Sequence, residues 1–194
     1  MWLCHSAKIG VLFKIFMKEI LSCLIIALFV FYPSVSRGEV YLTKKEALKR
    51  AFPDADEIKK EQFWLDDAQR KKISKLCNQK IEDKRLVFYA GKKSGKVIGY
   101  MTIDHYIGKT LPITFMVVLN TDGTVRDAAI MVYREPQGME VRYKFFLKQF
   151  FGKGASSTFR DINAITGATI SVRSMIKGVQ KAVSAFQVLI LNKT

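Results

Sequence analysis

The sequence predicts an α+β domain, a small antiparallel or mixed sheet flanked by helices, that follows an apolar N-terminal segment. Short β-rich stretches follow one another between residues 84 and 133. The turns between them are too short for crossover helices, so neighbouring strands pair antiparallel. Apolar residues recur at helical spacing before and after this region. The chain has 194 residues, 49% of them apolar, which suits a single domain with an appendage.

Residues 1–38 have the layout of a secretory signal or of an N-terminal membrane anchor. A largely apolar run from Ile20 to Tyr32 follows Lys18 and precedes small residues. The run is shorter than the roughly 20 residues that cross a bilayer, which favours a signal. Apolar residues upstream keep an uncleaved anchor open, and Met17 is a second candidate start. We expect export to the periplasm or to the extracytoplasmic face of the membrane.

Cleavage before Glu39 would leave a basic chain with a single cysteine, Cys77. The removed segment holds four of the 32 basic and one of the 17 acidic residues, so the formal charge falls from +15 to +12. No cysteine spacing typical of a zinc ribbon or an attached haem is present. The basic residues are dispersed and form no nucleic-acid recognition motif, so nucleic acid is not expected as a partner. One hypothesis is therefore a cofactor-free exported module that binds anionic lipid or an acidic protein.

Residues 39–83 are expected to form a helical N-terminal segment. Thr43 and Glu46 have the spacing of a capping box, which predicts a helix that Pro53 ends. A second helix is predicted to begin near Asp66, because apolar residues then recur at helical spacing.

Four strands are predicted after residue 84, and two helices follow them. The strands are Leu86–Tyr89, Val97–Ile103, Pro112–Leu119 and Thr124–Tyr133. The first helix has a core-facing stripe of Tyr143, Phe146, Leu147 and Phe150. The last helix has a longer apolar face, formed by Val172, Met175, Ile176, Val179, Val183, Phe186 and Ile190.

The loop 161–171 between these helices is the segment most suited to bind a ligand. It carries hydroxyl side chains and Gly167, and it runs directly into the last helix. The first amide groups of a helix have no backbone partners and lie at the positive end of its dipole, so such ends bind phosphate. The simpler alternative is that Thr169 or Ser171 is only the N-cap of that helix.

The tetrapeptide Thr166-Gly167-Ala168-Thr169 resembles the flavin-attachment motif of the FMN-binding domain family. Upstream, Tyr133–Glu135, Gly138 and Glu140–Arg142 are similar to the stretch that precedes this motif in exported members. The family includes the C subunit of the sodium-pumping NADH:quinone oxidoreductase and the G subunit of Rnf complexes. The resemblance covers about residues 97–183 and makes residues 84–194 the expected FMN-binding domain.

The resemblance implies that FMN is held through a phosphoester to Thr169, in a bond that a separate flavin transferase makes. It implies further cofactor contacts from Thr166, Gly167, Ala168, Ser171, Asn163, Glu135 and Gly138. One position departs from the family pattern: Asn163 stands six residues before the acceptor, where the transferase pattern has an aspartate. Asparagine keeps the size of aspartate but not its charge.

These implications predict an extracytoplasmic electron-transfer flavoprotein rather than a stand-alone enzyme. Its partners would be redox donor and acceptor proteins or a membrane electron-transfer complex, with the membrane surface as a further contact. No residue is assigned a catalytic or metal-binding role. The flavin would supply the redox chemistry, while the protein would orient it.

Overall fold

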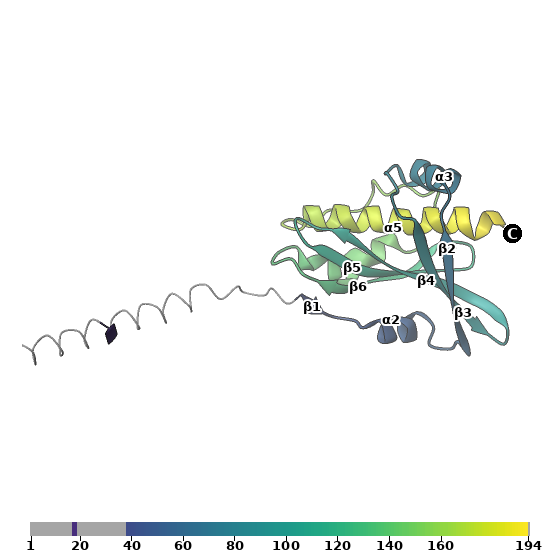
Figure 1. Ribbon diagram of the computed structural model, residues 1–194, viewed down its shortest axis with the longest axis horizontal. Helices are drawn as coiled ribbons and strands as arrows, with labels where there is room; N and C mark the ends of the chain where they lie inside the picture. Colours follow the sequence, from purple (N-terminus) through teal and green to yellow (C-terminus); the bar gives the residue numbers. More distant parts are fainter. Residues whose placement is uncertain (1–16, 19–37, 194) are drawn as a thin grey trace, which may run out of the picture. The chain divides into compact units, whose positions relative to one another are not determined.

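In the computed structural model, six antiparallel strands form one sheet in the order β1-β6-β5-β4-β3-β2 (Figure 1). The strands are β1 (Glu39–Val40), β2 (Glu57–Trp64), β3 (Arg85–Lys93), β4 (Lys96–Ile107), β5 (Pro112–Leu119) and β6 (Val125–Tyr133). The structure describes residues 17–18 and 38–193, so the expected signal segment lies largely outside the described residues. The chain divides into two units, Met1–Ser36 and Arg37–Thr194. Within the described residues, no helix combines the length and the hydropathy that a membrane span requires.

Helices cover both faces of the sheet (Figure 1). They are α2 (Lys44–Ala51), α3 (Asp67–Cys77), α4 (Lys144–Leu147) and α5 (Thr169–Leu189), with 3-10 turns η1 (Met139–Arg142), η2 (Lys148–Phe150) and η3 (Leu191–Lys193). The long helix α5, with α3 and the segment from η1 to η2, packs against the larger core. Helix α2 packs on the other face against a smaller core. The predicted α+β class with an antiparallel sheet is confirmed.

Helices α2 and α3 each begin at a capping box, at the positions that the sequence predicts. At α2, the Glu46 amide donates to Thr43 Oγ1 at 3.3 Å, and the Thr43 amide donates to Glu46 Oε2 at 2.8 Å. At α3, Asp66 and Gln69 exchange the equivalent bonds at 2.7 and 3.1 Å. Each pair satisfies amide groups that would otherwise lack partners at a helix start.

The expectation that residues 39–83 are helical is wrong for Glu39–Val40, which forms β1, and for Glu57–Trp64, which forms the longer strand β2. This strand pairs with β3 along its whole length, from Glu57 opposite Lys92 to Trp64 opposite Arg85. It is an edge strand with mostly exposed side chains, so it has no apolar alternation that the sequence would reveal. Its stability comes from backbone pairing and from cross-strand contacts such as the ion pair between Lys92 and Glu57, at 3.4 Å.

The first predicted helix after the strands is broken into short pieces. The backbone of Tyr143 is extended, which separates η1 from α4. The helical spacing therefore does not apply to Tyr143, whose side chain is 43% exposed and stacks on Phe145. Phe146, Leu147 and Phe150 are buried as predicted. The stripe was wrong at its first position, because an extended residue interrupts the helix there.

Helix α5 lies close to the sheet and is fixed to it by a buried lysine. A Cβ on Gly178 would lie 2.1 Å from the ring of Phe115, so glycine allows the close approach. Lys181 is buried and forms ion pairs with Asp104 on β4 at 2.7 Å and with Asp83 at 3.0 Å. Burial alone would lower the pKa of Lys181, but the two carboxylates outweigh it and raise the pKa.

Candidate functional site

A cavity of about 250 Å³ lies at the start of α5 and gathers residues from three separate parts of the chain. Its lining consists of Lys109, Glu135, Gln137, Gly167, Ala168, Thr169, Ile170 and Ser171. Five of these residues were predicted from the sequence as cofactor contacts. Lys109, Gln137 and Ile170 were not.

The start of α5 has no side-chain cap. Its N-cap is Ala168, and no side chain accepts hydrogen bonds from the first turn. Thr169 and Ser171 are the first and third helical residues, so the alternative that one of them is the N-cap is wrong. The first-turn amides lie in the residues that line the cavity. Because α5 is 21 residues long, this open end offers both free donors and the positive end of a helix dipole.

The backbone before α5 keeps the Thr169 side chain accessible. Gly167 has a φ of +83°, and a Cβ there would meet nothing within 4 Å. Glycine is thus favoured by the left-handed backbone rather than by lack of space. Thr169 is exposed in the cavity wall. Thr166 is also exposed, but it lies outside the cavity lining.

Two hydrogen bonds of Tyr133 connect β6 to the residues that line the cavity. The hydroxyl of Tyr133 donates to the carbonyl of Gln137 at 2.5 Å and lies 2.8 Å from Ser171 Oγ. Since a tyrosine has one hydroxyl proton, Ser171 is the donor in the second bond. Burial raises the pKa of Tyr133, which keeps it protonated. Gly138 lies against these two hydroxyls. A Cβ at this position would be 2.7 Å from Ser171 Oγ and 2.8 Å from Tyr133 Oη, so no larger residue fits without a shift.

Glu135 holds the turn that carries Lys109. Its carboxylate accepts the amides of Thr110 at 2.6 Å and Leu111 at 2.7 Å. Burial opposes the charged form, but these hydrogen bonds outweigh it and lower the pKa of Glu135. Glu135 therefore lines the cavity with a carboxylate that already accepts hydrogen bonds from two backbone amides. Lys109 brings a positive charge to the cavity from the turn that Glu135 holds.

Two residues considered from the sequence lie elsewhere. Asn163 is exposed, and its amide donates to Gln149 Oε1 at 2.7 Å. It does not line the cavity. Arg142, which is close in sequence to Gly138, lines a different pocket beside β6. The groups that do meet at the cavity are the free helix amides, hydroxyls, one lysine and the carboxylate of Glu135, which already accepts two amides. The free amides and the lysine suit a phosphate monoester.

Comparisons with known proteins agree with this chemistry. Residues 108–184 match the FMN-binding domain family. The chain is 32% identical over 106 residues to the G subunit of the proton-translocating ferredoxin:NAD(+) oxidoreductase complex from Clostridium ljungdahlii. That match covers 50% of this chain and 57% of the relative, so it spans little more than half of the relative's length.

Among solved structures, the chain is similar to NqrC from Shewanella oneidensis. The TM-score is 0.49 at 15% identity, over 75% of this chain and 87% of that one. The matched family segment contains the turn with Lys109, the strands β5 and β6, and the start of α5. Residues 108–184 of this chain therefore match the FMN-binding domain family, and FMN is the cofactor that this match supports.

Proposed function

We propose that this chain is an exported electron-transfer flavoprotein that holds one FMN through a phosphoester to Thr169. The observation that supports this most directly is the position of Thr169. This residue is exposed at the uncapped first turn of α5, within a cavity that is also lined by Lys109. The free amides and the lysine would neutralise the phosphate of FMN. When bound, the flavin supplies two-electron and one-electron redox chemistry.

The attachment needs an enzyme, because this site does not activate Thr169. A threonine hydroxyl is a weak nucleophile without a neighbouring base. The carboxylate that reaches the cavity belongs to Glu135, which already accepts two backbone amides. We infer that a flavin transferase supplies the base and uses FAD. The Oγ–P bond forms at Thr169, the phosphoanhydride of FAD breaks, AMP leaves, and the hydroxyl proton passes to the transferase.

The partners of this carrier are proposed by analogy with the matched relative. That relative is a subunit of a ferredoxin:NAD(+) oxidoreductase complex. A donor and an acceptor, or a membrane complex that contains both, would meet the flavin of this chain. The signal-like layout of residues 1–38 supports an extracytoplasmic location.

The carrier function is tested on the chain exported from cells that contain a flavin transferase. We expect a visible flavin spectrum that bleaches on anaerobic reduction with dithionite and returns on addition of ferricyanide. A mature N-terminus near Glu39 in the exported fraction would support the location. A folded, exported chain without any flavin would contradict the proposal and favour the cofactor-free basic module.

A further inference from the structure

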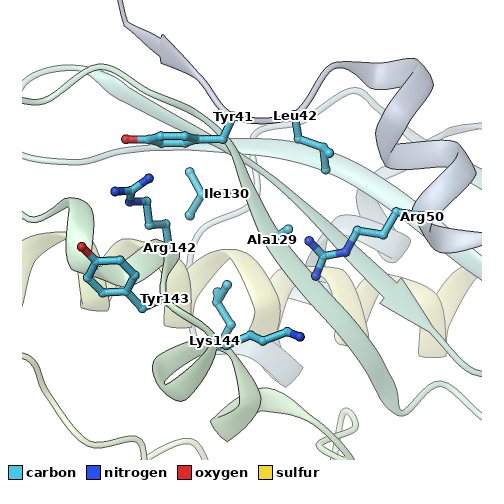
Figure 2. A pocket seen from close by; sticks show the side chains of 9 residues that line it. Tyr41, Leu42, Arg50, Ala129, Ile130, Arg142, Tyr143 and Lys144 are labelled. Carbon is cyan, nitrogen blue, oxygen red and sulfur yellow. The ribbon is translucent and has the colours of Figure 1, made fainter.

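A second pocket, of about 330 Å³, lies beside β6 and shares no lining residue with the cavity at α5. We call it the basic pocket. Its lining consists of Tyr41, Leu42, Arg50, Ala129, Ile130, Arg142, Tyr143, Lys144 and Leu147. Figure 2 shows Arg50 reaching in from α2, whereas Arg142 and Lys144 come from the segment that follows β6. We propose that the basic pocket binds a carboxylate group.

The guanidinium of Arg142 is held in place by aromatic rings. It lies 4.6 Å from the ring centroid of Tyr41 and 5.2 Å from that of Tyr143, between the two rings (Figure 2). Stacking of this kind leaves the in-plane N–H donors of an arginine free for a planar acceptor. Arg142 Nε is buried, and no hydrogen-bond partner for it is found within residues 38–193. Buried donors are normally paired, so the hydrogen bonding of Arg142 is incomplete within the described residues.

The charges around the pocket favour an anion with a single charge. Arg50 is neutralised by Asp127, whose carboxylate it contacts at 2.8 and 2.9 Å. Glu39 accepts the hydroxyl of Tyr41 at 2.6 Å and attracts Arg142 electrostatically. Three cations and two carboxylates leave one net positive charge. A carboxylate matches that charge better than a phosphate dianion does.

The floor of the pocket adds an apolar surface and part of a strand edge. Ile130 and Leu147 are buried there. The carbonyl of Met131 accepts from Tyr41 and Leu42 at the outer edge of β6. The volume is within the range of small-ligand sites, so the pocket suits a carboxylate on a small apolar body.

The carboxylate has two conceivable sources, a free organic acid or an acidic side chain of a protein, and the test separates them. The exported flavin-loaded chain is titrated calorimetrically with benzoate, with a blocked glutamate-containing peptide and with inorganic phosphate. Saturable binding of benzoate alone assigns a free acid, and tighter binding of the peptide assigns a protein side chain. Binding of phosphate as tight as that of either carboxylate would overturn the proposal, as would no saturable binding of either carboxylate.

Variants locate the binding in the basic pocket. Arg142→Gln is expected to weaken carboxylate binding by about tenfold or more, because it removes the charged planar donor. Lys144→Gln, at an exposed position, is expected to weaken it by a smaller factor, and it provides a test if Arg142→Gln fails to fold. Lys148→Gln is the matched control, since Lys148 is exposed on the same segment but outside the pocket. Equal affinity in all three variants would overturn the proposal, whether or not flavin is attached.

Discussion

Glycines with positive φ occur at several turns, and two of them allow a clean comparison. Gly138 has a φ of +85°, and Gly152 has a φ of +77°. A Cβ on Gly138 would meet Ser171 Oγ and Tyr133 Oη below 3 Å, whereas a Cβ on Gly152 would meet nothing within 4 Å. The left-handed backbone therefore disfavours other residues at both positions. Of the two, Gly138 alone is also required by its close contacts with Ser171 and Tyr133.

Gly138→Ala is expected to destabilise the fold more than Gly152→Ala does. The left-handed backbone should cost each variant about 1–2 kcal/mol. Gly138→Ala should lose more, because it also disrupts the bond between Ser171 and Tyr133. Urea unfolding of both variants measures the difference. Equal losses of unfolding free energy would show that the bond between Ser171 and Tyr133 does not depend on Gly138.

Asn163→Asp is expected to increase the fraction of chain that acquires flavin. Asn163 is exposed and lies outside the cavity, so a transferase can contact it without changing the site. The substitution restores the charge of the family pattern at nearly constant size. Intact mass at limiting transferase measures the modified fraction, with the exposed Asn192→Asp as control. An unchanged or smaller fraction would mean that this transferase does not recognise the charge.

At the scale of elements, Lys181 fixes α5 to the rest of the fold. Lys181→Ala is expected to cost about 3–5 kcal/mol of unfolding free energy, because it leaves Asp104 and Asp83 without their buried cation. The exposed Lys177→Ala, one turn earlier, should change stability little. Urea unfolding at pH 7 compares the two variants. A loss below about 1 kcal/mol in Lys181→Ala would contradict the anchoring role.

The raised pKa of Lys181 defines the pH range over which its ion pairs stabilise the fold. Because the folded-state pKa lies above the ordinary value of 10.5, the stabilisation is fully present below pH 10.5. It is lost as pH rises through the higher folded-state value. The difference in stability between the native chain and Lys181→Ala should therefore be constant from pH 6 to 9.

The turn that carries Lys109 should respond to pH in the opposite direction. Glu135 has a lowered pKa, so its stabilisation is present above the ordinary value of 4.5 and is lost as pH falls through the lower folded-state value. Glu135→Gln should lower the melting temperature at pH 7 and show a smaller further loss on acidification. Thermal unfolding from pH 7 to 3.5 measures this, with Glu61→Gln on β2 as control. Parallel acid profiles for the native chain and Glu135→Gln would contradict the role of this tether.

Elements with a local signal could be predicted, and those that depend on tertiary pairing could not. The starts of α2 and α3 follow from capping residues, and the buried face of α5 follows from its apolar spacing. Strand β2 has no such signal, because half of its side chains are charged, most of them are exposed, and its stability comes from pairing with β3.

The residues of the site also fall into two groups, those that a local sequence motif identifies and those that only the tertiary fold brings to the site. The motif residues around Thr169 are contiguous, so the sequence identifies them together. Lys109 reaches them only through the antiparallel topology and the tether by Glu135, and Tyr133 only through its bond to Ser171. Nothing in the local pattern around Lys109 marks it as a site residue.

At the scale of the whole molecule, the domain is held by its cores and ion pairs, without a disulfide in the part that the structure describes. Cys77 is a free, buried thiol, and burial raises its pKa. Reducing agent should leave the melting temperature of the cleaved chain unchanged. Cys77 should react with a thiol reagent in urea but only slowly in the native state. A melting temperature that falls on reduction would reveal a covalent cross-link between chains.

Attachment of FMN at Thr169 is tested by intact mass under denaturing conditions. The exported chain from cells with a flavin transferase is compared with Thr169→Val and Thr166→Val. Thr166 is the matched control, because it is an exposed threonine of the same loop outside the cavity. We expect a gain of one FMN less one water, with colour that survives denaturation, in the native chain and Thr166→Val but not in Thr169→Val. A modified Thr169→Val, or a native chain that loses all colour on denaturation, would contradict it.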